Sequence, residues 1–240
     1  MDAKIEAIGE VTLDSKAAID EARAAYAALS DEAKALVTKL AVLEAAEADY
    51  AVLTCEVSLK VTGGEDITVA DDKLTFTVSA EGAEKLATLT LKLTYDQNTM
   101  TDVKLTPAEG WAFLIQTIEN GEIKVIVYSL TGLTGTGDLF TIEAATTGEV
   151  GDATVAITEA RLSAFIANGE TYVAVNLDDA SATVKVDYNI YDVNRDGVVN
   201  QLDITRGQRW FGTDNEICDV DNSGEVDIAD LILIANNYTK

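Results

Sequence analysis

The sequence predicts a multidomain protein with three parts: a small three-helix bundle, an antiparallel β-sandwich and a small α-helical part built on two calcium loops. Three observations carry this prediction. Residues 1–53 hold sixteen alanines, residues 54–186 are rich in threonine and valine, and residues 187–240 contain one acidic motif twice. Alanine favours helices, β-branched residues favour strands, and acidic loops of this kind favour calcium. The domain boundaries are therefore predicted at 1–53, 54–186 and 187–240.

The composition excludes several classes of function. The chain has 240 residues, with 17 basic and 42 acidic side chains, a net charge of −25 and no histidine. Such a charge opposes binding to nucleic acid, whose phosphates need a basic surface, and to anionic membranes. Catalytic arrangements that need an imidazole are excluded as well. Hard cations, which prefer oxygen ligands, suit a chain this acidic.

The alanine-rich segment predicts three helices. Apolar residues recur at helical spacing within residues 19–29 and again within residues 36–53. A short leading helix is expected before Gly9. Thr12 and Ser30 are typical N-cap residues for the second and third helices.

Residues 54–186 predict about nine short strands. Apolar and polar residues alternate in several segments, and glycine-containing turns separate them. The clearest alternations are Val57/Leu59/Val61, Leu74/Phe76/Val78, Leu89/Leu91/Leu93/Tyr95 and Val155/Ile157. Residues Ile123–Leu130 are apolar at both parities, which predicts a strand covered on both faces. Trp111 and Phe113 stand at alternate positions and fit either a core or a sugar-stacking platform.

The strongest signal is an internal repeat in the C-terminal part of the chain. Residues 192–203 align with residues 219–230, and both segments place oxygen-bearing side chains at positions 1, 3, 5, 9 and 12, with glycine at position 6. This is the spacing of a twelve-residue calcium loop, in which six to eight oxygen atoms surround the ion. The glycine allows the chain to reverse sharply. An acidic turn pair that binds nothing is the alternative.

The alignment assigns a ligand set to each loop and therefore predicts two Ca²⁺ ions. The first ion is expected to take Asp192, Asn194, Asp196, Val198 through its carbonyl, Asn200 directly or through water, and Asp203. The second is expected to take Asp219, Asp221, Ser223, Glu225 through its carbonyl, Asp227 and Asp230. Because Ser223 is a neutral ligand, the second site is expected to be the weaker one.

A helix is predicted after each loop, at Ile204–Phe211 and at Leu231–Tyr238. A part this small has little core of its own, so bound metal is expected to supply part of its folding free energy.

Two loops of this kind that end in Asp, each followed by one helix, resemble a dockerin module over residues 188–238. The resemblance implies that a cohesin is bound through loop positions 10 and 11 and through the exposed face of the following helix. These residues are Gln201, Leu202, Gln208 and Arg209 in the first repeat and Ile228, Ala229, Ala235 and Asn236 in the second. Leu202, Ile228 and Ala229 have internal packing as an alternative role. Since the halves differ chemically, we expect one of them to dominate.

Two further resemblances cover the rest of the chain. Residues 54–186 are similar to a cohesin module in the opening strand Glu56–Val61, the strand Leu89–Tyr95 and the glycine-rich stretch from Tyr128 to Phe140. This implies a jelly-roll sandwich that receives a dockerin. Residues 11–48 are similar to the FIVAR-type helical modules of bacterial surface and secreted proteins.

These features predict a non-catalytic adaptor in an extracellular assembly that degrades polysaccharides. Its C-terminal part would bind a cohesin-bearing protein, and its sandwich would bind a dockerin-bearing protein. A sandwich that accepted its own kind of C-terminal part would join chains head to tail, through a contact that does not close on itself. The alternatives are a carbohydrate-binding or adhesion module attached to an assembly by its dockerin, and a fragment of an enzyme.

Few other residues suggest chemistry. A glycosidase needs two carboxyl groups that face each other across a sugar, whereas the acids of the sandwich are scattered: Asp96, Asp102, Glu109, Asp138 and Glu143. Cys55 and Cys218 fit two separate buried thiols better than one long-range bridge, which stays open. No segment approaches the ~20 apolar residues of a membrane span, and no signal peptide is visible. We therefore expect a fragment of a longer secreted protein.

Overall fold

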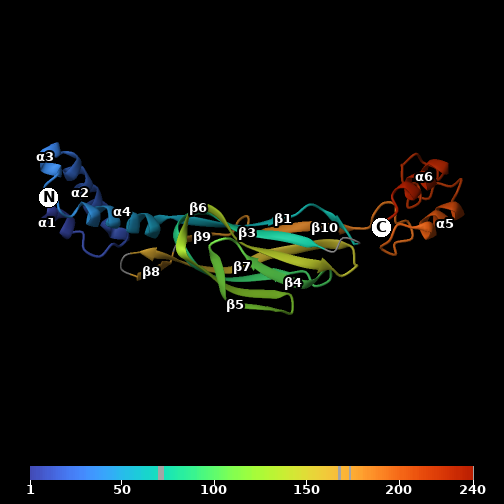
Figure 1. Cartoon of the computed structure of the whole chain (residues 1–240), viewed down its shortest axis with the longest axis horizontal. Helices are drawn as coiled ribbons and strands as arrows, with labels where there is room; N and C mark the ends of the chain where they lie inside the picture. The colour runs from blue at the N-terminus through green and yellow to red at the C-terminus, as the bar shows by residue number, and fades with distance from the viewer. Residues whose placement is uncertain (70–72, 167–168, 173, 240) are drawn as a thin grey trace.

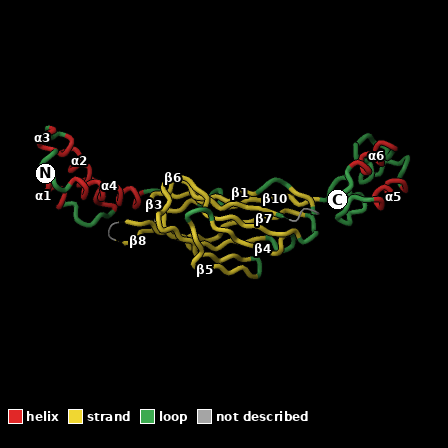
Figure 2. The backbone as a smooth tube through the Cα atoms, in the orientation of Figure 1, coloured by secondary structure: helices red, strands yellow, loops and turns green. Residues whose placement is uncertain are grey.

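The computed structural model describes residues 1–69, 73–166, 169–172 and 174–239. The molecule is elongated. Figure 1 and Figure 2 show helices at the N-terminal end, a two-layered β-sandwich in the middle and further helices at the C-terminal end. None of the described helices is long and apolar enough to cross a membrane.

The N-terminal part is helical, as its alanine content predicts. Its elements are α1 (Asp2–Glu6), a short 3₁₀-helix (Leu13–Ser15), α2 (Lys16–Ala27), α3 (Asp31–Lys34) and α4 (Leu40–Thr54). Ile5, Ile19 and Leu43 are at the centre of their common core. Ser30 caps α3, since its hydroxyl accepts a hydrogen bond of 3.3 Å from the Ala33 N–H.

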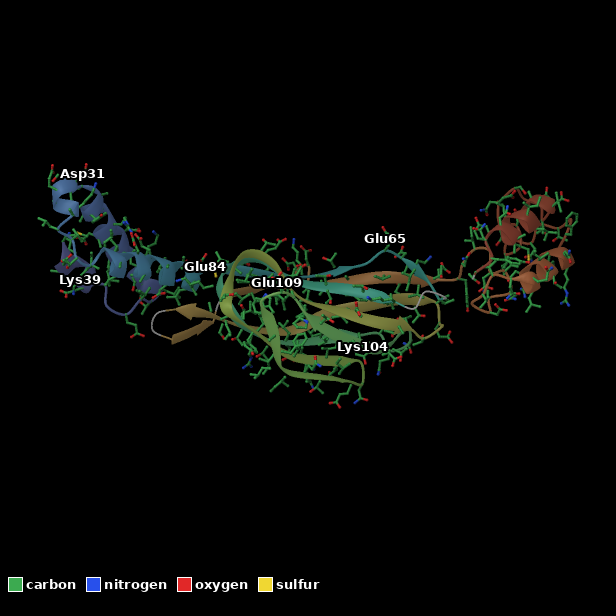
Figure 3. The ribbon with its side chains drawn as sticks, in the orientation of Figure 1. Asp31, Lys39, Glu65, Glu84, Lys104 and Glu109 are labelled. Carbon is green, nitrogen blue, oxygen red and sulfur yellow. The ribbon has the colours of Figure 1, made fainter. Side chains whose placement is uncertain are left out.

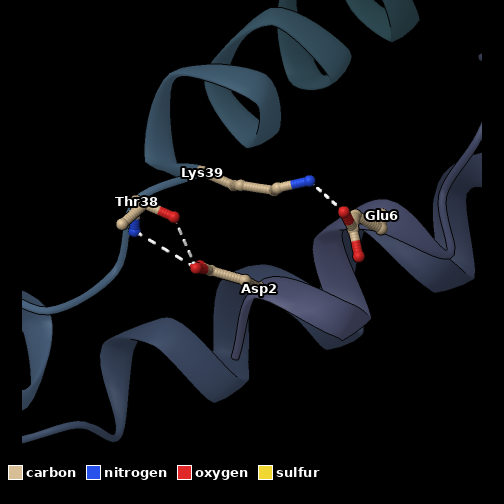
Figure 4. Close-up of polar contacts among 4 residues, drawn as sticks. All are labelled: Asp2, Glu6, Thr38 and Lys39. Carbon is tan, nitrogen blue, oxygen red and sulfur yellow. Dashed lines mark hydrogen bonds and ion pairs between the residues drawn. The ribbon is translucent and has the colours of Figure 1, made fainter.

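The third predicted helix is two helices, so the prediction of a three-helix bundle is corrected. α3 ends at Lys34, and α4 begins only at Leu40. Between them the chain turns toward α1: the Thr38 hydroxyl donates a hydrogen bond of 2.6 Å to Asp2, and Lys39 pairs with Glu6 (Figure 4). The break leaves Leu36 79% exposed instead of buried in the helical core.

The described residues of the sandwich form ten strands. They are β1 (Glu56–Gly63), β2 (Ile67–Thr68), β3 (Leu74–Tyr95), β4 (Met100–Pro107), β5 (Trp111–Glu119), β6 (Glu122–Thr146), β7 (Gly151–Ile166), β8 (Gly169–Tyr172), β9 (Ala174–Asn176) and β10 (Ser181–Asp187). Most pairs are antiparallel, but β1 pairs with β9, and β2 with β10, in parallel. The sandwich is therefore mixed rather than antiparallel. Three of its strands are long, at 22, 25 and 16 residues for β3, β6 and β7.

The two longest strands belong to both layers. In the first layer, residues 74–80 of β3 lie between β1 and residues 137–144 of β6, and β4 adds to β6. In the second layer, residues 88–94 of β3 lie between residues 122–128 of β6 and β7, with β5 and β10 outside them. β3 passes from the first layer to the second between residues 78 and 88, where its pairing with β6 shows register shifts. Such bulges let a strand bend from one layer to the other.

Gly82 stands at this passage and shows why a glycine is needed there. Its φ is +71°, and a Cβ at this position would lie 2.6 Å from the carbonyl oxygen of Glu56. A side chain would therefore meet both backbone strain and a direct clash.

Burial follows the predicted alternation in β1 and β3, where Val57, Leu59, Phe76 and Leu91 are in the core. The prediction for Ile123–Leu130 is wrong. Only alternate residues of this segment are buried, Ile126 and Tyr128 are half-buried, and Leu130 is 83% exposed. No described element covers the outer face of the second layer at this strand, so one of its two faces meets solvent.

Trp111 and Phe113 belong to the core. Both are half-buried and pack against the main hydrophobic cluster, and Phe113 meets Phe140 edge-on with ring centroids 5.7 Å apart. This contact favours the core role over the sugar-stacking platform.

The last turn of α4 joins the helical end to the sandwich. α4 lies against β3 and β7. Val52 of this helix is fully buried within the hydrophobic cluster of the sandwich, and Cys55 packs against the same cluster. The helix thus continues directly into β1 with a shared core, and no free linker lies at this junction.

The C-terminal part, residues 187–239, is called the tail below. Its helices are α5 (Gln201–Arg209) and α6 (Ile228–Asn236), which lie beyond the end of β10 in Figure 1. Each begins three residues before its predicted start, because a side chain of the loop caps it. Val199, Val226 and Ile234 form the small core of the tail. α5 and α6 approach closely at Gly207, where a Cβ would lie 2.7 Å from Leu231 Cδ2.

The two thiols lie in different parts of the molecule and are not bonded to each other. Cys218 is buried in the tail, and Cys55 is half-buried between α4 and β1 rather than buried as predicted. Burial raises the pKa of both thiols, which keeps them protonated and weakly nucleophilic.

Candidate metal centre and docking surfaces

The first acidic loop is closed by hydrogen bonds from its backbone to two buried carboxylates. Asp192 accepts from the N–H of Asp196 at 3.1 Å and of Gly197 at 2.7 Å. Asp203 accepts from the N–H of Asn194 at 3.0 Å and of Asn200 at 2.8 Å. The first and last acids of the loop, only 3% and 0% exposed, therefore both face its interior.

The second loop repeats these four hydrogen bonds, and Asp230 accepts one more, from the N–H of Val220 at 2.8 Å. Asp219 accepts from the N–H of Ser223 at 2.9 Å and of Gly224 at 2.8 Å. Asp230 accepts from the N–H of Asp221 at 3.2 Å and of Asp227 at 2.8 Å. Each donor and acceptor of the four shared bonds occupies the same loop position as its counterpart in the first loop, so the sequence repeat is also a structural repeat.

The predicted reversal of the chain occurs at position 6 of both loops. Gly197 and Gly224 have φ values of +87° and +95°, in the left-handed region that glycine tolerates best. Position 4 is left-handed too, at Arg195 and Asn222. The two reversals turn the limbs of each loop toward one interior.

Each loop also caps the helix that follows it. Asn200 and Asp227, at position 9, accept from the N–H of the residue two positions later, at 2.7 and 2.6 Å. Asp203 and Asp230, at position 12, complete a capping box on the same helix. The residues assigned to the ion therefore also start α5 and α6, which couples the geometry of the loop to the order of the helix.

Three carboxylates of the second loop could hold a metal ion. Oxygen atoms of Asp219, Asp221 and Asp230 all lie within 4.8 Å of one another. All three are hard oxygen donors from positions 1, 3 and 12, which is the chemistry that Ca²⁺ prefers. In the first loop, position 3 is Asn194, whose amide N–H donates to Asp196 at 2.9 Å.

The two carbonyl oxygens assigned to the ions, at position 7, lie beside other assigned side chains. The Val198 carbonyl accepts from the Asn200 amide at 3.2 Å, and the Glu225 carbonyl accepts from the Ser223 hydroxyl at 3.1 Å. Position 7 thus contributes a carbonyl oxygen in both loops. The residues present fit a calcium ion, which would be held by these oxygens together with the acids.

Electrostatics in the first loop favours a bound cation. Burial raises the pKa of Asp192, the N–H groups of Gly197 and Asp196 act against this shift, and the carboxylates of Asp203 and Asp196 add to it. The folded loop thus holds like charges close together in a poorly solvated place. A divalent cation would remove this penalty.

The predicted protein-binding residues lie at the surface of the tail. Seven of the eight are exposed and one, Ala229, is half-buried; the exposed ones are Gln201, Leu202, Gln208, Arg209, Ile228, Ala235 and Asn236. Leu202 and Ile228 are each 60% exposed. Internal packing, the alternative role of these two residues, is therefore contradicted, whereas Ala229 is partly packed.

Sequence reasoning missed one residue of this surface. Ile232 is 52% exposed and lies one helical turn after Ile228 on α6. The helical i, i+4 spacing from Ile228 is the signal that would have identified it.

The outer face of the second layer has a shallow apolar hollow of about 300 Å³. Ile115 and Ile126 are in its lining, together with Lys92, Lys124 and Arg161. Ile115 is 53% exposed, so a large apolar side chain meets solvent here. Of the acids considered for hydrolysis, Asp102 and Glu143 line a separate hollow of about 340 Å³ together with Lys73 and Lys104. Asp102, Glu109 and Asp138 are exposed, and Glu109 lies on the sandwich surface in Figure 3. Asp96 accepts from the Asn98 N–H within a turn, and Glu143 pairs with Lys73.

Comparisons with known proteins bear on the sandwich alone. No family model and no curated protein matches the chain. Among solved structures, a cohesin module from a Clostridium perfringens family 33 glycoside hydrolase is 13% identical, over 57% of this chain and 100% of that one, with a TM-score of 0.47. A non-cellulosomal cohesin from Archaeoglobus fulgidus is 19% identical, over 54% and 91%, with a TM-score of 0.41. A chain from a type I cohesin–dockerin complex of Clostridium thermocellum is 12% identical, over 57% and 96%, with a TM-score of 0.42. Because the sequence identities and TM-scores are this low, the partners of this chain are inferred below from its own residues.

Proposed function

We propose that the protein is a non-catalytic adaptor whose tail binds two Ca²⁺ ions and docks on a cohesin of another protein. The observation that carries this proposal is the repeated loop. Two separate segments of the tail share their acids at positions 1 and 12, their left-handed glycines and the backbone hydrogen bonds that those acids accept. A chance acidic turn would have no reason to recur with the same hydrogen bonds.

The bound ions would act by ordering the helices. Position 12 of each loop holds the N–H groups of positions 3 and 9, and position 9 caps the helix. Calcium at these oxygens would fix both ends of the loop and with them the start of α5 or α6. The docking residues from Gln201 to Arg209 and from Ile228 to Asn236 lie on or at the start of these helices, so binding to a partner would depend on calcium.

The sandwich would be the second docking part, and would receive a dockerin of a third protein on the outer face of its second layer. That face has a hollow with exposed Ile115 and half-buried Ile126 in its lining and charged residues around them, and no described element covers it. Exposed apolar surface with a polar rim is typical of protein interfaces.

The setting proposed for this adaptor is an extracellular assembly that degrades polysaccharides, with the protein secreted or held at the cell surface by its partners. The N-terminal helices would then be a FIVAR-like module that extends the sandwich, because Val52 of α4 is part of the sandwich core.

Calcium binding by the full chain is the first test. Titration calorimetry should detect two Ca²⁺ ions, and the double variant Asp219→Asn/Asp230→Asn should lose one of them. Asp214 is an exposed acid of the tail outside both loops. The Asp214→Asn variant is therefore the control for lost charge and should bind both Ca²⁺ ions. A chain that binds no calcium would contradict the proposal.

Partner capture is the second test. The immobilised full chain should retain cohesin-bearing proteins in calcium and release them on addition of a chelator. Dockerin-bearing proteins should be retained through the sandwich, and the Asp219→Asn/Asp230→Asn variant of the immobilised chain should retain them equally well. Capture of cohesins that a chelator leaves unchanged would disprove the role of the loops.

A further inference from the structure

The two halves of the tail have the same architecture but different outer stripes. Along α6, Ile228, Ile232 and Ala235 follow one another at positions i, i+4 and i+7, and all three are exposed. The residues at the equivalent positions of α5 are Gln201, Thr205 and Gln208, which are polar. An exposed apolar stripe on one of two matched helices has no role in the packing of the tail, which buries Leu231 and Ile234 instead.

The hollow on the second layer matches this stripe in chemistry. Ile115 and Ile126 provide its apolar surface, and Lys92, Lys124 and Arg161 stand around them against one acid, Glu159. Glu122 pairs with both Lys92, at 2.9 Å, and Lys124, at 3.2 Å, so three bases against two acids give a local net charge of +1, on a chain whose net charge is −25.

The tail carries the opposite charge. Residues 187–240 contain eleven acids and four bases, a net charge of −7, and two bound Ca²⁺ ions would leave it at −3. On so acidic a molecule, the basic rim of the hollow is a place where this tail would be attracted rather than repelled.

The tail of the same molecule does not reach the hollow. β10 leaves the sheet beside Gly151 of β7, whereas the hollow lies near Ala160, nine residues further along that strand, or roughly 30 Å. Only residues 188–191 separate β10 from the first loop, and four residues span at most about 14 Å. In the structure the tail extends beyond the end of β10, away from the sandwich (Figure 1), so the tail that occupies the hollow is assigned to another copy.

We propose that the apolar stripe of α6, in its calcium-bound form, docks in the second-layer hollow of another copy of this chain. The α6 half is then the docking half of the tail. The contact joins two different surfaces, so each copy still offers one free tail and one free hollow, and chains grow head to tail. This inference rests on the proposed function, since it needs a tail that calcium orders and a sandwich face that receives it.

Light scattering of the full chain tests the inference. In calcium, the mean mass should rise with protein concentration without a plateau at the dimer, and a chelator should return it to the monomer. Ile232→Glu in the stripe and Ile115→Glu in the hollow should each weaken association by about tenfold or more. Both residues are more than half exposed, so neither change disturbs the core.

Two matched controls separate the contact from a general effect of added charge. Thr205→Glu changes the equivalent position of α5, and Thr106→Glu changes an exposed residue of β4 in the first layer. Both variants should associate like the unchanged chain. Equal weakening by the controls would overturn the inference.

A mixing experiment tests the direction of the contact. The Ile232→Glu variant keeps an intact hollow, and the Ile115→Glu variant keeps an intact tail. At a concentration at which the unchanged chain associates and each variant alone is monomeric, their equimolar mixture should form a one-to-one complex that does not grow. A complex of either variant with itself would overturn the inference.

The remaining outcomes separate this inference from the proposed function. A chain that binds two Ca²⁺ ions but stays monomeric at high concentration, or forms a dimer that does not grow, would overturn the inference and leave the adaptor proposal in place. A chain that binds no calcium would overturn both.

Discussion

Single residues set the shape of the two acidic loops. Position 12 is Asp in both loops, and its short side chain places one carboxylate between the backbone of positions 3 and 9. Position 6 must be left-handed, and position 9 must cap a helix. Three separate requirements thus act within each loop, and the sequence meets all of them twice.

Gly224 is the residue at which the backbone requirement can be tested. Its φ is +95°, and the space around its Cα is open. Gly224→Ala should therefore act through backbone strain alone, at a cost of about 1–2 kcal/mol, and should weaken calcium binding to the second loop. Calorimetry with calcium measures the loss. Gly224→Asn, which tolerates the left-handed conformation better, should lose less; an equal loss in both variants would contradict this explanation.

Glu122 on β6 should titrate below the ordinary range of a glutamate. Hydrogen bonds from Lys92 and Lys124 lower its pKa. The ionised form is thus the one that folding favours: its contribution to stability is present above the ordinary pKa and is lost as the pH falls through the lowered value. NMR titration of the carboxyl carbon measures this pKa. In the Lys92→Met variant it should move up, and a normal value in the unchanged chain would contradict the prediction.

At the scale of elements, α4 is the connection between the helical end and the sandwich. Its N-terminal half packs on α2 through Leu43, and its last turn buries Val52 in the core of the sandwich. One continuous helix therefore belongs to two cores. The helical end should move with the sandwich, in contrast to a module on a free linker.

Removal of two methyl groups at Val52 tests this connection. Val52→Ala should lower the free energy of unfolding by about 2 kcal/mol, since the side chain is fully buried. Val42→Ala, on the same helix but 53% exposed, should change it by less than about 0.5 kcal/mol. Urea unfolding of the full chain measures both values. Equal effects of the two substitutions would show that the last turn of α4 carries no shared core.

At the scale of the whole molecule, three parts follow one another along one axis. The N-terminal helices and the tail lie at opposite ends in Figure 1, so the outer face of the sandwich is left free between them. Such an arrangement suits a protein that must contact partners at more than one place. It also separates a part with a large apolar core from a tail whose core is only a few side chains.

Calcium should therefore stabilise the tail far more than the rest of the chain. A chelator should lower the helical signal by the contribution of α5 and α6 and should expose residues 187–239 to protease, while residues 1–186 stay resistant. Circular dichroism and limited proteolysis followed by mass spectrometry measure the two effects. Cleavage that is equally fast with and without calcium would contradict the dependence of the tail on metal.

The sequence by itself determined the features that depend on neighbours in the chain. The acidic loops could be predicted because ligands, reversing glycine and helix cap all lie within one short segment. The helical content of the alanine-rich N-terminal part and the buried alternate residues of β1 could also be predicted, because both depend on residues that are close in the sequence. The break at residues 35–39 could not be predicted, because it depends on contacts between Thr38 and Asp2 that are far apart in the chain.

Only the tertiary structure decided which surfaces are covered and which are free. The passage of β3 and β6 between two layers, the burial of Val52 in a second core and the exposure of Ile115 all depend on which strands become neighbours. Burial is a property of the assembled fold, and a segment such as Ile123–Leu130 has the same sequence whether one or two of its faces are covered. The local sequence therefore specified the acidic loops, whereas the tertiary fold decided which surfaces of the sandwich are exposed.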